Sequence, residues 1–281
     1  MTNENLLPFD PNKVPDLIKQ GKVRVVTAPT VPVAISAPEQ TGMSDPMIER
    51  AQRILGKDFL GPKSVIFMQE KLNAVGVDVE FNIDNLPPIP YDEQDIQLAS
   101  QNGEMLVLRA GAQRLNGTEE DLTVMNFREL FRQDPNSKLA TSFYSFRSGA
   151  NDWYPSENFA AQPGEIQLGW ALVKKDVLSN SKNKKWDKQE ELLRKYGEEL
   201  KKKGGTNTQV GRRTAMEATW DTMLYYVHTG EQLLPGVYDW TKSRTSNGRL
   251  VFVGHFDSDG LHVLHWHPED ANELIGVCPA R

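Results

Sequence analysis

Hydrophobic residues recur at helical spacing in several stretches of the chain. These stretches are residues 47–55, 64–74, 122–132, 184–203 and 214–229. Within 184–203, Trp186, Leu193 and Leu200 follow one another at intervals of seven residues, which places them on one helix face. Gly204 and Gly205 come next and provide a stop signal. The pattern therefore predicts a helix over each of these stretches.

The helix expected at 214–229 has the clearest start signal in the chain. Thr214 is followed three residues later by Glu217, the capping-box arrangement in which each side chain satisfies a free backbone amide at the helix start. The apolar residues that follow form one stripe: Met216, Trp220, Met223, Leu224 and Val227. Such a stripe is typical of a helix that packs on a core, so we assign these side chains to the core and not to a cofactor site.

Strands are predicted at 104–111 and 165–175, and the pattern changes again after Gly230. From residue 236 onward, short apolar runs alternate with turn residues. The strands expected there are 237–241, 249–256, 261–266 and 275–279, with core candidates Trp240, Leu250, Val251, Val253, Leu261, Val263, Ile275 and Val277. Helices combined with short antiparallel strands predict an α+β fold.

The first 95 residues differ from the rest in composition. Residues 1–46 contain Pro29, Pro32 and Pro38 within an otherwise β-like stretch. Because proline removes a hydrogen-bond donor from a sheet, this part can supply only edge strands or an extended wrap. A second proline-rich stretch, 85–94, marks a boundary. We therefore expect an N-terminal extension or accessory region at 1–95 and a C-terminal domain at 96–281.

Composition narrows the classes of function. The chain has a formal net charge of −6, with 38% hydrophobic and 25% charged residues, an ordinary balance for a soluble globular protein. The acidic balance argues against nucleic acid as a partner, because phosphate binding needs a surplus of Lys and Arg. The N-terminus lacks a signal-peptide pattern, and no apolar run approaches about 20 residues. We expect a cytoplasmic protein without membrane insertion.

Side chains suited to recognition are concentrated in the C-terminal segment, 236–281. Four of the five histidines lie between residues 255 and 267, and the same segment contains Tyr238, Asp239, Arg244, Asp257 and Asp259. Such side chains add little to a core but are common in recognition surfaces. Three interpretations are open for this segment: a polar surface without a specific role, a metal site, and a ligand-binding face.

The metal interpretation uses the alternation of side chains along a strand. His265 and His267 are two residues apart and would share a face, and His255, Asp257 and Asp259 alternate in the same way. Imidazole and carboxylate groups suit zinc, and three such ligands with a water would make a catalytic site. No HExxH helix or CxxC pair accompanies them. A metal-dependent enzyme is therefore the alternative to a ligand-binding protein.

Several pieces of the C-terminal two-thirds resemble the formylglycine-generating-enzyme branch of the C-type lectin fold. That branch has a helix carrying Trp, a short strand reading W-x-W-T, a glycine-bearing hairpin and a closing strand. The corresponding pieces here are residues 214–227, 238–241, 250–254 and 275–281. More closely, residues 169–189, the capped helix and the FDSDGL run at 256–261 resemble variable proteins of diversity-generating retroelements. The resemblance covers about residues 100–281.

This resemblance implies a C-type-lectin-like domain, with main helices around 186–203 and 214–229 and small antiparallel sheets that display a variable C-terminal surface. In such systems the adenines of a template repeat are randomised. The products include Tyr, Asp, His, Ser, Phe, Leu, Arg and Val, but not Glu, Lys, Gln, Met or Trp. The implied ligand-binding positions all belong to the permitted set: Tyr238, Asp239, Arg244, Phe252, His255, Asp257, Asp259, His262, Leu264, His265 and His267. The positions expected to be fixed are Trp240, Lys242, Trp266, Glu269 and Glu273.

The sequence also departs from the pattern of that branch. The enzymes rely on paired cysteines, and this chain has only Cys278, which argues against thiol-based oxidase chemistry. The closing strand reads GVC in place of GFR, and no EPN or WND motif for calcium-dependent sugar binding occurs. We therefore expect a non-enzymatic protein without a cofactor that binds a protein partner. A structural protein that assembles through its N-terminal region is a further alternative.

Overall fold

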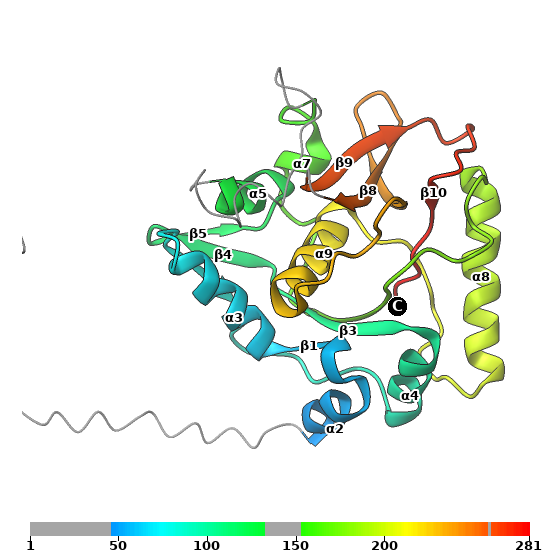
Figure 1. Cartoon of the computed structure of the whole chain (residues 1–281), viewed down its shortest axis with the longest axis horizontal. Coiled ribbons are helices and arrows are strands. Elements are labelled where there is room, and N and C mark those ends of the chain that lie inside the picture. The colour runs from blue at the N-terminus through cyan, green and yellow to red at the C-terminus, as the bar shows by residue number, and fades with distance from the viewer. Residues whose placement is uncertain (1–45, 133–152, 258–259) are drawn as a thin grey trace, which may run out of the picture. The chain divides into compact units, whose positions relative to one another are not determined.

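The computed structural model describes residues 46–132, 153–257 and 260–281, which form an α+β fold (Figure 1). Its first elements are α2 (Pro46–Leu55), the 3-10 turn η2 (Gly56–Asp58), β1 (Phe59–Leu60), α3 (Pro62–Asn73), β2 (Val79–Asn82), α4 (Glu93–Asn102), β3 (Glu104–Arg109), β4 (Ala112–Leu115), β5 (Thr118–Asp121) and α5 (Val124–Arg132). They are followed by α7 (Asn158–Ala161), β6 (Gly169–Lys174), α8 (Trp186–Lys202), α9 (Ala215–Thr229), β7 (Tyr238–Arg244), β8 (Leu250–Asp257), β9 (Gly260–Trp266) and β10 (Ile275–Gly276). The predicted helices and strands within the described residues are confirmed.

The described strands form three small sheets. One has the order β1-β3-β6, a second β2-β4-β5, and the third β10-β7-β8-β9. In the third sheet β7, β8 and β9 are antiparallel neighbours, and β10 adds to β7 in parallel. This four-stranded sheet is therefore built entirely from the C-terminal segment.

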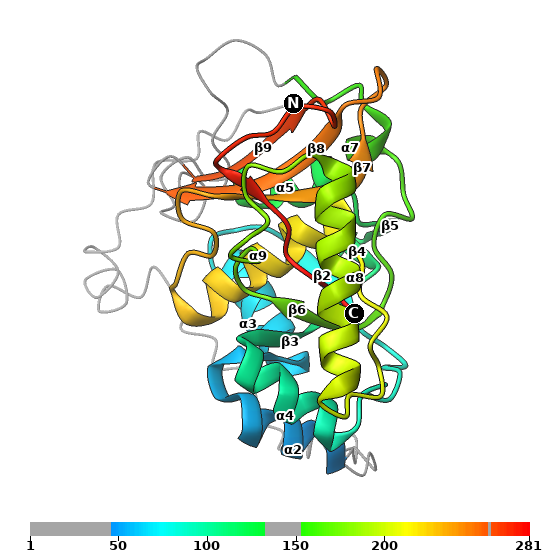
Figure 2. The ribbon, with the colours of Figure 1, turned by 90° about the vertical axis from the view of Figure 1, so that its right-hand side faces the viewer.

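Helix α9 lies between this sheet and the sheet that contains β3 (Figures 1 and 2). Its capping box is present as predicted, because the Thr214 hydroxyl accepts from the Glu217 amide and the Glu217 carboxylate accepts from the Thr214 amide. Residues 215–225 are all buried except Glu217, and Trp220 donates its indole N–H to the Leu108 carbonyl oxygen. A helix buried on nearly all sides needs this apolar composition. The Met and Trp residues of α9 are thus core residues, as expected.

The C-terminal residues close the fold beside β6. Ala280 forms bridges to Val173 and Gly211, and the buried Arg281 side chain forms ion pairs with Asp95 and Glu104 at 2.9 Å each. Burying an unpaired charge would be costly, so this arginine stabilises the fold only together with its two carboxylates.

Residues 46–95 do not form the separate accessory region that we expected. Residues 44–281 group as one compact unit, and β1 pairs with β3. Leu60 of β1 and Met68 of α3 are completely buried in the main core. The described part of the N-terminal region therefore contributes to the same domain, and the division of the chain lies near residue 44. The prolines Pro29, Pro32 and Pro38 lie outside the described residues.

Candidate recognition face

The two faces of the β10-β7-β8-β9 sheet have different neighbours. Val251, Val253 and Val263 point into the main core, which is the side of the sheet that α9 covers. The opposite side carries its own cluster, made of Tyr238, Trp240, Leu250, Phe252 and Ile275, with Trp186 and Leu264 packed against it. We name these the inner face and the outer face.

Strand register arranges the outer face in rows that run across β7, β8 and β9. Paired residues on neighbouring antiparallel strands share a face. The first row contains Arg244, Leu250 and Trp266; the second Trp240, Phe252 and Leu264; the third Tyr238, Gly254 and His262. Five of the residues expected to bind a ligand therefore lie on one face: Tyr238, Arg244, Phe252, His262 and Leu264.

Exposure differs strongly along these rows. Tyr238, Phe252 and His262 are each only 5% exposed, and Leu264 is half-buried. In the first row Arg244 is exposed and Trp266 is 40% exposed. A ligand approaching the outer face would thus meet the first row before the third.

Asp239 was expected on the recognition surface, but it lies on the inner face. Its carboxylate accepts hydrogen bonds from the Arg213 guanidinium at 2.7 and 3.0 Å and from the Cys278 amide at 2.7 Å. Burial alone would lower the pKa of Arg213, but its carboxylate neighbours, Asp239 foremost, outweigh burial and raise the pKa. Adjacent strand residues point to opposite faces, so Asp239 cannot share the side occupied by Tyr238. Asp239 belongs to a buried ion-pair network and is not a surface residue.

A β-bulge in β8 determines where His255 and Asp257 lie. The register with β9 shifts between Gly254 and Asp257, and His255 has a left-handed backbone with φ 46°. Gly254 has φ 146°, and a Cβ there would stand 2.5 Å from the Val237 carbonyl oxygen. The bulge is therefore specified by a glycine and by a histidine, one of the residue types that tolerate positive φ.

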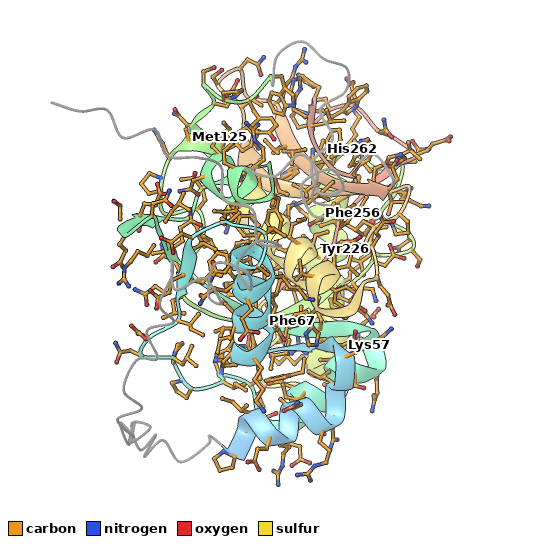
Figure 3. All side chains as sticks on the ribbon, turned by 60° about the vertical axis from the view of Figure 1, so that its left-hand side comes forward. Lys57, Phe67, Met125, Tyr226, Phe256 and His262 are labelled. Carbon is orange, nitrogen blue, oxygen red and sulfur yellow. The ribbon has the colours of Figure 1, made fainter. Side chains whose placement is uncertain are left out.

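The bulge brings His255 into contact with the third row of the outer face. Its ring stacks on Tyr238 at 5.4 Å between centroids and lies 5.2 Å from the His262 ring. Asp257 lies near both histidines, with Oδ2 3.3 Å from His255 Nε2 and Oδ1 3.8 Å from His262 Nε2. Phe256, the next residue of β8 after His255, is buried in the main core, and its ring packs on Tyr226 of α9 with the centroids 5.0 Å apart. His262, Phe256 and Tyr226 are labelled in Figure 3.

The remaining predicted site residues do not join this cluster. His265 lies on the inner side next to Trp153, with ring centroids 4.5 Å apart, and its Nδ1 is 3.4 Å from Arg249 Nη1. His267 is exposed beyond the end of β9, and Asp259 lies outside the described residues. His265 and His267 therefore do not share a face, because the strand ends between them.

A metal site is not found in the described part of the chain. Within residues 46–132, 153–257 and 260–281, no group of three or more His, Cys, Asp or Glu side chains is arranged to hold a metal ion. The metal interpretation stays a hypothesis from the sequence, since it includes Asp259.

Trp186 packs on the outer face, a position that its place in the predicted helix 184–203 does not reveal. It stands at the start of α8, and its ring lies 3.6 Å from the Arg212 guanidinium carbon and 5.7 Å from that of Arg244. It also meets Trp240 edge-on at 5.9 Å. The helical spacing of Trp186 predicted only the helix face that it shares with Leu193 and Leu200, and its contact with β7 depends on tertiary packing that periodicity does not encode.

Comparisons of the chain with protein-family models, with curated proteins and with solved structures find no match. Among the helices that the structure describes, none combines the length and the apolar character needed to cross a membrane.

Proposed function

We propose that this chain is a ligand-binding protein whose recognition surface is the outer face of the β10-β7-β8-β9 sheet, and that its partner is a protein. The observation that carries this proposal is the first row of that face. Arg244 and Trp266 are both exposed there, although Trp and Arg are the residue types that most often dominate binding energies at interfaces. Neither Arg244 nor Trp266 belongs to the main hydrophobic core.

We further propose a C-type-lectin-like domain for this fold. The support is the order of the pieces: a long polar helix α8, a capped core helix α9, a short strand β7 carrying Trp240, a glycine-bearing strand β8, and a closing strand β10. The outer face then corresponds to the surface that varies in the proteins of diversity-generating retroelements.

Diversification of the outer face is the third part of the proposal. The accessible or half-buried positions Arg244, His255, Asp257, Leu264 and His267 all carry residues that adenine randomisation can produce. Trp266 stands among them and lies outside that set, so we assign it to the fixed part of the surface. We exclude Asp239 from the diversified positions, because its buried carboxylate neutralises Arg213.

The genetic part of the proposal is tested by sequencing codons 236–281 and the flanking DNA across a natural population. We expect variation at Arg244, His255, Asp257, Leu264 and His267, with Asp239 and Trp266 constant. A near-copy of the segment and a reverse transcriptase gene should lie nearby. Uniform variation along the segment, or an invariant segment without a template copy, would exclude diversification.

The binding part is tested with a variant in which Arg244, Leu264 and Trp266 are all replaced by alanine. We expect loss of binding to any peptide or protein selected against the wild-type chain, with a small change in the thermal midpoint. The matched control replaces three exposed residues of α8, Lys188, Arg194 and Lys201, which should leave binding intact. Unchanged binding by the outer-face variant would refute the assignment of the surface.

A further inference from the structure

The exposed row of the outer face combines an apolar and a cationic anchor at a fixed separation. Arg244 and Trp266 each pair with Leu250, so they stand two strands apart, roughly 10 Å at ordinary strand spacing. Leu250 between them is fully buried. A partner that contacts both side chains therefore needs two different chemical groups about this distance apart.

Arg244 is held in place before any ligand arrives. Its guanidinium carbon lies 5.7 Å from the Trp186 ring, and its Nη1 donates to the Gly248 carbonyl oxygen at 3.1 Å. A cation–π contact with an aromatic ring and a backbone hydrogen bond both restrict the rotamers of the long side chain. Binding through Arg244 consequently loses less conformational entropy than binding through a freely moving arginine.

The end of the β7–β8 hairpin is locally cationic in a chain whose net charge is −6. Residues 241–250 contain Lys242, Arg244 and Arg249, all exposed, and no Asp or Glu. Among the residues that the structure describes, no carboxylate forms an ion pair with any of these three side chains. These three cations therefore carry positive charge that no direct ion pair within the described residues offsets.

Two carboxylates do approach the hairpin, but both are engaged by its serines. Glu157 accepts from the Ser246 amide at 2.6 Å and from its hydroxyl at 3.1 Å, and Glu165 accepts from the Ser243 hydroxyl at 3.0 Å. Ser243 faces the start of α9, since its hydroxyl oxygen also accepts from the Ala215 amide. Both carboxylates keep their negative charge, but neither forms an ion pair with Arg244, so the guanidinium on the outer face has no carboxylate in direct contact among the described residues.

We infer that the outer face of this chain binds an acidic peptide segment, in which a carboxylate pairs with Arg244 and an aromatic or large aliphatic side chain packs on Trp266. This inference rests on the proposed function and names the chemistry of the partner. Carboxylate and guanidinium groups form paired hydrogen bonds of matching geometry, and Trp offers a large apolar contact at low entropic cost. Trp266 anchors every version of a diversified surface, and Arg244 sets the acidic preference of this one.

The test is selection of a display library of random linear peptides on the whole chain, followed by affinity measurements with the enriched peptides made synthetically. We expect enriched sequences to share an Asp or Glu separated from an aromatic or aliphatic residue. Arg244→Glu should weaken binding about tenfold or more, the size expected for a charge-assisted pair. Replacing the peptide carboxylate by lysine should restore binding to Arg244→Glu and to no other variant.

Lys242→Glu is the matched control, because Lys242 is an exposed cation on the same strand but outside the row. We expect it to change affinity less than about threefold, as for a charge at the rim of an interface. Arg244→Gln should fall between the wild type and Arg244→Glu, and thermal melts should show that all three variants fold.

The outcomes separate this inference from the proposed function. The enriched peptides could be neutral or basic, bind Arg244→Glu normally and lose binding to Trp266→Ala. This outcome would refute the acidic preference but would still support the outer face as the recognition surface. If no enriched peptide is sensitive to any outer-face variant, both are refuted. Equal losses with Lys242→Glu and Arg244→Glu would show a nonspecific charge effect and would also overturn the inference.

Discussion

The inner and outer faces of the four-stranded sheet are made by the same strands, and each face carries an arginine, Arg213 beside β7 on the inner face and Arg244 at the end of β7 on the outer face. On the inner face Arg213 is 2% exposed and is neutralised by Asp239 and Asp221, with the nearest atoms 2.7 and 3.1 Å apart. On the outer face Arg244 is exposed, rests against an aromatic ring and has no carboxylate partner in the described part of the chain. The charge of Arg213 is therefore part of a buried ion-pair network, whereas the charge of Arg244 is exposed, and we propose that a partner uses it.

The sharpest way to test this contrast is to remove one carboxylate from each face. Asp239→Ala should lower the free energy of unfolding by about 3–5 kcal/mol, because it leaves the buried Arg213 without its closest partner. It also removes the acceptor of the Cys278 amide. Asp257→Ala is the matched control, since Asp257 is half-buried beside the histidines of the outer face. Urea unfolding of both variants measures the two free energies of unfolding. Equal losses of free energy would contradict the contrast between the two faces.

The second largest effect is expected at the bulge that shapes the outer face. His255 has φ 46°, a conformation that β-branched residues adopt only under strain. His255→Val should therefore destabilise the protein by about 1–3 kcal/mol, whereas His255→Asn should be tolerated. Thermal unfolding of the two variants separates backbone strain from loss of the ring contact with Tyr238. A similar loss for both would assign the effect to the ring.

The bulge also limits which diversified residues can stand at position 255. If the surface is varied as we propose, natural variants there should be mostly Asn, Asp, His or Gly, even though randomisation offers many others. Backbone geometry would then restrict the residue types found at position 255. It would not restrict those at position 264, because Leu264 lies in a regular part of β9.

Much of this architecture could be predicted from the sequence where local signals are strong. The capped helix α9 and the strands β7, β8 and β9 were predicted because caps, glycines and apolar periodicity agree there. The β4–β5 hairpin was missed because all four residues of β5 are polar and exposed, TEED. The signal that would have revealed it is Asn116-Gly117, whose φ values of 50° and 80° suit a tight hairpin turn.

The sequence did not determine how the expected site residues are distributed over the two faces of the sheet. Strand alternation alone would have shown that Tyr238 and Asp239, neighbours on one strand, cannot both face the same side of the sheet, but not which of the two faces outward. The contacts of Trp186 and Arg213 with β7 could not be predicted, because they join residues that are far apart in the sequence. Helix α4 was also missed, although Asp92 caps its start and Gly103 ends it, because the prolines before it suggested a boundary.

A smaller effect on stability, with a large effect on binding, is expected at Trp266. Because the residue is 40% exposed, Trp266→Ala should lower the free energy of unfolding by no more than about 1 kcal/mol. Trp240→Ala is the contrasting variant in the next row, fully buried, and should cost about 3–5 kcal/mol. Peptides selected against the outer face should bind Trp266→Ala at least about tenfold more weakly. A destabilisation comparable to that of Trp240→Ala would show that Trp266 is structural.

The smallest effect is a dependence of stability on pH that comes from the inner side of β9. Burial lowers the pKa of His265, and the charge of Arg249 lowers it further. The folded protein therefore takes up this proton less readily than the unfolded chain does, so stability declines as the pH falls through about 6.5 toward the lower pKa of the folded state. Burial also lowers the pKa of His228, which adds to the decline in the same direction. Thermal midpoints measured between pH 8 and pH 5 should fall less steeply for His265→Asn than for the wild type, and least steeply when His228→Asn is added. Parallel curves for all three proteins would show that folding does not lower the pKa of either histidine and would place the pH dependence elsewhere in the molecule.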